Sequence, residues 1–207
     1  MTSRIAKIIS WLLIGALAIT ELVATGLMWR GHSPFGVVIH GLLGLAMIVI
    51  GWWALRCIHH QRIFSRRQPS LSQSYVLVIT NLAMLEIIAI HDCDHMRQAM
   101  GWGYRFTLAL LLVNIIVYLP NLISIVLASQ GRLSGVLATL VSGPLIAVAF
   151  LKLHLLGAWL PVWGSWNQSF FALGVDLLSW WVLAITAIAG VLVGVVATYI
   201  LGQLSVH

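Results

Sequence analysis

Residues 35–57 read FGVVIHGLLGLAMIVIGWWALRC, and this run decides the fold class. It is long enough to cross a bilayer as one helix, because a spanning helix needs about 20 mostly apolar residues. Its only charged side chain is Arg56, which lies next to the end of the run. A helix satisfies its own backbone hydrogen bonds, as any segment in hydrocarbon must. The run therefore predicts a transmembrane helix.

Five more runs of this kind surround the first, at about 5–29, 75–98, 105–129, 134–157 and 176–203. The chain has 207 residues, of which 61% are hydrophobic and 8% are charged. Soluble domains carry about 25% charged residues. No internal repeat, low-complexity stretch or linker divides the chain. We therefore predict an all-α, polytopic membrane bundle of six transmembrane helices, which forms a single domain over residues 1–207.

The basic residues predict the orientation of this bundle. Three of them, Arg30, Arg97 and Arg105, fall at one face. Seven fall at the other, namely Arg4, Lys7, Arg56, Arg62, Arg66, Arg67 and Arg132. The face with more Lys and Arg is normally cytoplasmic, so both termini are predicted to be cytoplasmic and the membrane to be a bacterial inner (plasma) membrane. Because the net charge of +6 arises mostly in these loops, we expect the lipid bilayer as partner and no nucleic acid.

The acidic residues and most histidines gather on the opposite side. Five of the eight histidines fall in the outer half of the predicted bundle: His32, His40, His91, His95 and His154. All five acidic residues do so as well: Glu21, Glu86, Asp92, Asp94 and Asp176. Ionisable groups inside apolar spans are costly, so they normally pair with one another or line a wet cavity. The asymmetry predicts a polar cavity that faces the extracytoplasmic side.

The richest part of this cavity is the stretch His91-Asp92-Cys93-Asp94-His95-Met96-Arg97-Gln98. On a helix His91, Asp94, His95 and Gln98 share one arc, and two histidines four residues apart can hold one metal ion. Nitrogen, oxygen and sulfur donors together suit Zn, Ni, Co or Cu. We predict His91, Asp94 and His95 as metal ligands, with His40 or His154 completing the site. The alternative is a solvated helix end in which the aspartates pair with Arg97.

The remaining charged groups are expected to set the charge of the cavity or to form ion pairs: Glu21, Glu86, Lys152, Asp92 and Arg97. Lys152 paired with Glu86 or Glu21 is the ion pair that we expect inside the membrane. Purely structural pairing between helices is the competing explanation.

The segment Asp92-Cys93-Asp94-His95-Met96 resembles the Asp-Ala-Asp-His-Ile part of the nickel/cobalt permease signature. The resemblance covers five residues, and Ala89 occupies the position of the upstream His of that signature, with His91 nearby. The length and six-helix layout are similar to those of the substrate-capturing subunits of energy-coupling-factor importers for vitamins and metals. These resemblances imply a membrane protein that handles a transition metal.

Two further features point to contacts at the outer face and between helices. Trp159, Trp163 and Trp166 form an aromatic segment, which fits an interfacial belt or a lid over the cavity. Gly190 and Gly194 form a GxxxG pair, which is typical of a close helix–helix contact. Partner subunits or a second copy of the chain are expected at this glycine face.

Three functions fit these features. The first is a ligand-binding or transport protein for a transition-metal ion or a metal-containing small molecule. The second is a membrane redox protein with haem b, in which His40, His91 and His154 are the candidate axial ligands. The third is a non-catalytic accessory subunit of a larger membrane complex. The sequence has no Walker A loop, GxSxG, CxxC or HExxH motif, so we do not expect an enzyme; outer His/Asp pairs acting as general bases on a lipid or quinone are the remaining alternative.

Overall fold

The computed structural model describes residues 3–61, 68–102, 107–157 and 168–205. Within these residues every regular element is a helix, which confirms the all-α prediction. The helices are α1 (Ser3–Arg30), α2 (Pro34–His59), α3 (Leu71–Trp102), α4 (Leu108–Ser129), α5 (Leu133–Leu156), α6 (Phe170–Leu173) and α7 (Leu177–Ser205).

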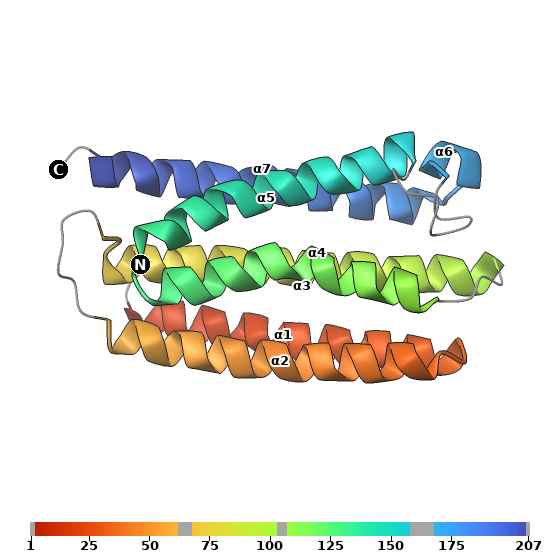
Figure 1. Cartoon of the computed structure of the whole chain (residues 1–207), viewed down its shortest axis with the longest axis horizontal. Helices are drawn as coiled ribbons and strands as arrows, with labels where there is room; N and C mark the ends of the chain where they lie inside the picture. The colour runs from red at the N-terminus through yellow and green to blue at the C-terminus, as the bar shows by residue number, and fades with distance from the viewer. Residues whose placement is uncertain (1–2, 62–67, 103–106, 158–167, 206–207) are drawn as a thin grey trace.

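Five of these helices, α1, α2, α3, α5 and α7, are long and apolar enough to cross a membrane. Large apolar side chains such as Leu12, Leu22 and Val148 are exposed along their outer faces. Apolar surface of this extent is typical of a contact with lipid rather than water. The chain therefore has the character of an integral membrane protein. Helix α4 runs beside the others (Figure 1), but its described apolar part, Asn114–Ser129, is shorter.

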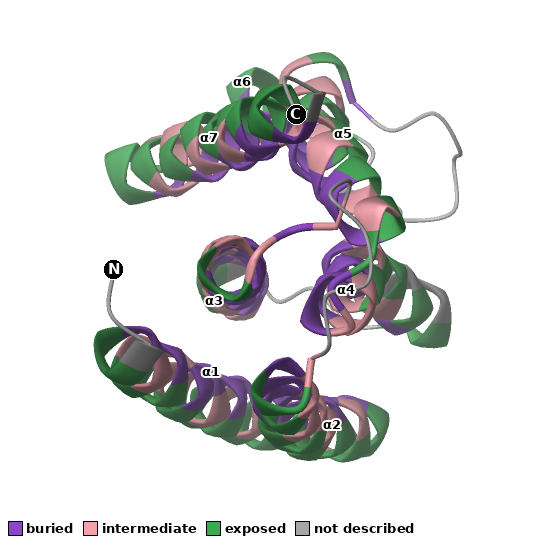
Figure 2. Ribbon diagram, turned by 90° about the vertical axis from the view of Figure 1, so that its left-hand side faces the viewer, coloured by how far each residue is buried: buried purple, intermediate pink, exposed green. Residues whose placement is uncertain are grey.

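Helix α3 occupies the centre of the bundle. Seen along the bundle, the other long helices form an arc around it that is open between α1 and α7 (Figure 2), and it contacts α1, α2, α4, α5 and α7. In its apolar window 56% of the residues are buried, against 28–39% in the other four candidate spans. The helix that carries the His91–Gln98 stretch is thus the one that faces protein on most sides.

Helix α1 begins and helix α7 ends at the same end of the bundle, and the α1–α2 turn lies at the opposite end (Figure 1). Helix α2 begins at this turn because Ser33 caps it, accepting a hydrogen bond from the Gly36 N–H, and Pro34 occupies its first position. Proline is favoured there since its missing N–H has no helical partner in any case.

Helix α3 begins four residues before the apolar run that predicted it, at Leu71 rather than near Tyr75. The reason is a reciprocal cap: the Ser70 hydroxyl accepts from the Gln73 N–H, while the Gln73 side chain accepts from the Ser70 N–H. This capping box satisfies two backbone donors at the start of the helix. The short helix α6, which the sequence did not predict, is capped by Ser169 and ends at Leu173, where Gly174 follows with φ of 61°.

Helices α5 and α7 cross at very short distance through their glycines. A Cβ atom added to Gly190 would lie 2.5 Å from the Gly143 carbonyl oxygen, and one added to Gly194 would lie 2.8 Å from Pro144 Cγ. The GxxxG face, for which we expected a partner subunit, is thus packed against α5 within the same chain. This contact fixes the position of α5 relative to α7 next to the site described below.

Candidate metal centre

Three imidazoles from two helices converge inside the bundle. His91 and His95 lie one turn apart on α3, and His154 lies in the last turn of α5. One ring nitrogen of each lies within 4.8 Å of the others, and the two Nε2 atoms of His91 and His154 are 3.0 Å apart. Ligands of a tetrahedral zinc ion with Zn–N bonds of about 2.0–2.1 Å are separated by about 3.4 Å. Small ring rotations would therefore place the three nitrogens around one ion.

The hydrogen bonds of Thr186 on α7 determine which nitrogen of His91 is available. The Thr186 hydroxyl donates to the Val182 carbonyl at 2.8 Å. Its oxygen lies 2.9 Å from His91 Nδ1 and so accepts from that ring N–H. The lone pair of neutral His91 is then on Nε2, which faces His154. Metal-bound histidines typically donate a hydrogen bond from the N–H of their second ring nitrogen, and this bond fixes both the ring orientation and the tautomer.

Two phenylalanines pack against the three rings. The Phe150 ring centroid is 4.4 Å from that of His91, and the Phe170 centroid is 4.2 Å from that of His154. His91 and His154 are buried, and His95 is half-buried. Phe170 belongs to α6, so this short helix covers the group where α5 ends. An apolar shell of this kind controls the access of solvent to a metal site.

The predicted ligand Asp94 lies outside the trihistidine group, which we define as His91, His95 and His154. One carboxylate oxygen of Asp94 accepts from the Arg97 guanidinium at 2.7 Å, and the other accepts from the Gln98 amide at 2.9 Å. Both partners lie on the same helix. Each of the two alternatives for this stretch therefore describes part of it. The histidines converge, as expected for a metal site, while Asp94 pairs with Arg97, as expected for a paired helix end.

Arg97 also ties α3 to the start of α7. Its guanidinium donates to Asp176 at 2.7 Å. This guanidinium and the Ser179 N–H lower the pKa of the Asp176 carboxyl to about 2. Because the pKa is lowered, the ion pair contributes at neutral pH and is lost only as the pH falls towards that value. The Asp176 side chain is 52% exposed, so the pair positions the two helices more than it stabilises them.

The predicted ligand His40 belongs to a second polar group. Its Nδ1 lies 2.9 Å from Glu21 Oε2. Near this pair the Tyr118 hydroxyl donates to Asp92 at 2.8 Å. The four residues come from α2, α1, α4 and α3 respectively, and all are buried. His40 therefore completes a carboxylate–imidazole pair instead of the trihistidine group.

The structure pairs Lys152 and the two glutamates differently from our expectation. Glu21 pairs with His40, and Glu86 accepts a hydrogen bond of 2.7 Å from the Thr20 hydroxyl. The Lys152 ammonium donates to the Gly157 carbonyl, just past the end of its own helix. The carbonyls at a helix C-terminus carry partial negative charge, which attracts a nearby ammonium. The expected Lys152–glutamate pair is not among the ion pairs of the described residues.

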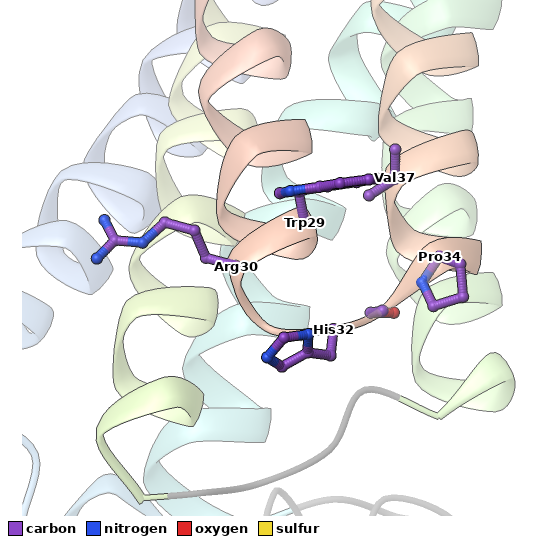
Figure 3. Close-up of a pocket in the computed structure, with 6 residues that line it drawn as sticks. Trp29, Arg30, His32, Pro34 and Val37 are labelled. Atoms are coloured by element: carbon purple, nitrogen blue, oxygen red, sulfur yellow. The ribbon is translucent and has the colours of Figure 1, made fainter.

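A shallow pocket of about 480 Å³ lies at the α1–α2 turn, lined by Trp29, Arg30, His32, Ser33, Pro34 and Val37. Figure 3 shows the Trp29 ring reaching across to Val37, whereas Arg30 points away from the turn. This pocket contains none of the converging histidines. The predicted aromatic lid or belt of Trp159, Trp163 and Trp166 lies outside the described residues.

Thr186 and Phe150 are the site residues that the sequence did not single out. Thr186 is a polar residue in a strongly apolar helix, which is the only signal for it in the sequence. Nothing in a single sequence indicates which ring such a hydroxyl meets on another helix.

Comparison with protein-family models, curated proteins and solved structures finds no match to this chain. The fold and the site therefore define its class by themselves: a helical membrane protein with a buried trihistidine group that could hold a metal ion.

Proposed function

We propose that this protein binds a transition-metal ion at His91, His95 and His154 and carries or captures that ion at the membrane. One observation supports the proposal above the others: three ring nitrogens converge from α3 and α5. A second observation agrees with it. The Thr186 hydroxyl accepts from His91 Nδ1–H, so the His91 Nε2 lone pair is directed towards the same point.

The ligand set favours a particular group of metals. Neutral imidazoles suit Zn, Cu, Fe and Ni, whereas Mg and Ca prefer carboxylates. Structural zinc sites normally have four protein ligands, and three-histidine sites leave one position open for water or another ligand. A carrier needs such an open position because the ion must enter and leave. For this reason we favour transport or capture over a purely structural metal.

The finer topology belongs to the same proposal. Six crossings with both termini in the cytoplasm would put the trihistidine group towards the extracytoplasmic side, since His154 lies near the end of α5. This orientation agrees with the excess of Lys and Arg at the opposite end. It makes the protein a candidate for uptake of the ion from outside the cell.

The purified full-length protein should contain or take up about one transition-metal ion per chain. A ligand that binds only the folded state stabilises that state. Zn²⁺ or Ni²⁺ at about 100 times its Kd should therefore add about 2.7 kcal/mol to the free energy of unfolding. Elemental analysis and thermal unfolding with each metal measure both quantities. Absence of metal together with absence of any thermal shift would contradict the proposal. A Soret band in the visible spectrum of the same sample would instead favour the haem b alternative.

Thr186→Val is expected to weaken metal binding about 10- to 100-fold, the usual effect of removing an outer-shell partner. Valine keeps the shape of threonine, so the change mainly removes the acceptor for His91 Nδ1–H. Thr198→Val is the matched control, because Thr198 lies on the same helix and its hydroxyl donates to the Gly194 carbonyl. Titration calorimetry of both variants measures the difference, and equal affinities for the two would show that Thr186 does not orient a ligand.

A further inference from the structure

A second buried polar group lies on another side of α3, where α1, α2 and α4 meet it. Its centre is the hydrogen-bonded pair of Glu21 and His40, whose side chains are each 1% exposed. The other ends of this pair, Glu21 Oε1 and His40 Nε2, are also buried and have no hydrogen-bond partner among the described residues. These two atoms can therefore each bind a further small ligand.

The group contains more acids than bases. Glu21 lies within electrostatic range of both Asp92 and Glu86. Within the described residues, the ion pairs give these three acids one basic partner, which is His40 beside Glu21. Arg97 is paired with Asp94 and Asp176, and the Lys152 ammonium donates to the Gly157 carbonyl. If all three acids were ionised, even a protonated His40 would leave an uncompensated negative charge inside an apolar bundle. Buried carboxyls in that situation become neutral by binding protons.

A chelated metal ion is the other way to compensate this charge, and the geometry does not favour it. Among the described residues, the trihistidine group is the one set of His, Cys, Asp and Glu side chains whose donor atoms converge on a point. The donors of Glu21, His40 and Asp92 do not converge in this way. A proton, which needs only one acceptor atom, fits the arrangement better.

We propose that Glu21, Glu86 and His40 form a proton-binding group, which takes up and releases a proton inside the membrane bundle. A proton on the Glu21 carboxyl can pass to His40 Nδ1, which leaves a carboxylate and an imidazolium. The imidazolium then passes its other proton from Nε2 to a water molecule, which becomes a hydronium ion, because each of the two ring nitrogens can hold and release a proton. No atom or electron other than the proton is transferred. Asp92 and Cys93 from α3 and Tyr118 from α4 are the other titratable groups near the pair.

The proposed proton site does not depend on metal at the trihistidine group. The two groups share helix α3, but the proton site draws its other residues from α1 and α2, and the metal site draws its third ligand from α5. An experiment that disproves one of the two sites therefore leaves the proposal for the other unaffected.

Infrared spectroscopy of the full-length, metal-free protein in lipid nanodiscs tests the proposal. The chain contains only two glutamates, Glu21 and Glu86, so labelling with ¹³C-glutamate marks these two carboxyls alone. We expect a carbonyl band of a protonated acid at neutral pH, which shifts in ²H₂O and on ¹³C-glutamate labelling and disappears as the pH is raised. The label needs no mutation, so this arm does not depend on a variant that folds.

Variants then locate the proton. Glu21→Gln should remove the band or reduce it by at least about half, and His59→Ala, at an exposed residue outside both groups, should leave it unchanged. A band that shifts only with ¹³C-aspartate, or that is absent at neutral pH, would overturn the proposal. Loss of the band on addition of Na⁺ or Mn²⁺ would also overturn it, because the group would then be a site for a metal cation.

Discussion

His154→Ala is expected to lower the affinity for Zn²⁺ or Ni²⁺ at least about 100-fold, which corresponds to about 2.8 kcal/mol. His154 is the only member of the trihistidine group that does not come from α3. Without it, His91 and His95 keep two ligands on one helix turn, and the ion loses its contact with α5. Loss of an inner ligand should exceed the 10- to 100-fold effect that is usual for an outer-shell partner. Titration calorimetry with a competing chelator measures the change.

The control for this variant is His59→Ala, which removes an exposed histidine near the other end of the bundle. It should bind metal as the wild type does. Circular dichroism and thermal unfolding without metal must show that His154→Ala is folded, because His154 also packs against Phe170. A folded His154→Ala protein with wild-type affinity would exclude the trihistidine group as the metal site.

Gly190→Leu is expected to have the largest effect on stability, a loss of about 3 kcal/mol or more in the free energy of unfolding. Its Cβ would lie 2.5 Å from the Gly143 carbonyl oxygen and 2.9 Å from Ala147 Cβ. The backbone at Gly143 cannot move without displacing α5, so the added side chain must push α5 and α7 apart. Overpacking of a well-packed interior typically costs about 1–3 kcal/mol, and here the contact is with backbone. Thermal unfolding in detergent measures the loss.

The same substitution should also weaken metal binding, because α5 carries His154 and α7 carries Thr186. Gly202→Leu is the matched control: it lies on the same helix, and an added Cβ there meets nothing within 4 Å. If both variants unfold at the wild-type temperature, the close α5–α7 contact is not what holds these helices together.

The class of fold was predictable from the sequence because hydrocarbon leaves few alternatives. A run such as 35–57 must be helical, since only a helix satisfies its backbone within one segment. The ends of the helices were less predictable. Helix α3 begins at Leu71 because of the Ser70–Gln73 capping box, which adds a polar turn before the apolar run. The length of the apolar run alone does not indicate this additional polar turn.

The candidate site was predictable only in part. The spacing of His91 and His95 places them together on one helix turn, whatever the rest of the chain does. The choice between His40 and His154 as the third ligand stayed open, because both fall at similar predicted depth. His40 instead pairs with Glu21, and His154 meets His91 at 3.0 Å. Depth along the membrane normal does not determine which side of α3 a neighbouring helix occupies.

The sequence by itself thus determined an apolar helical chain, a polar stretch at 91–98, and two histidines that share a helix face. Only the tertiary structure decided that α5 and α7 bring His154 and Thr186 to that face, and that α1 and α2 bring Glu21 and His40 to another. The physical reason is that the helical period fixes contacts within a helix. Contacts between helices depend on close packing, such as that of Gly143 against Gly190, which involves residues far apart in the chain.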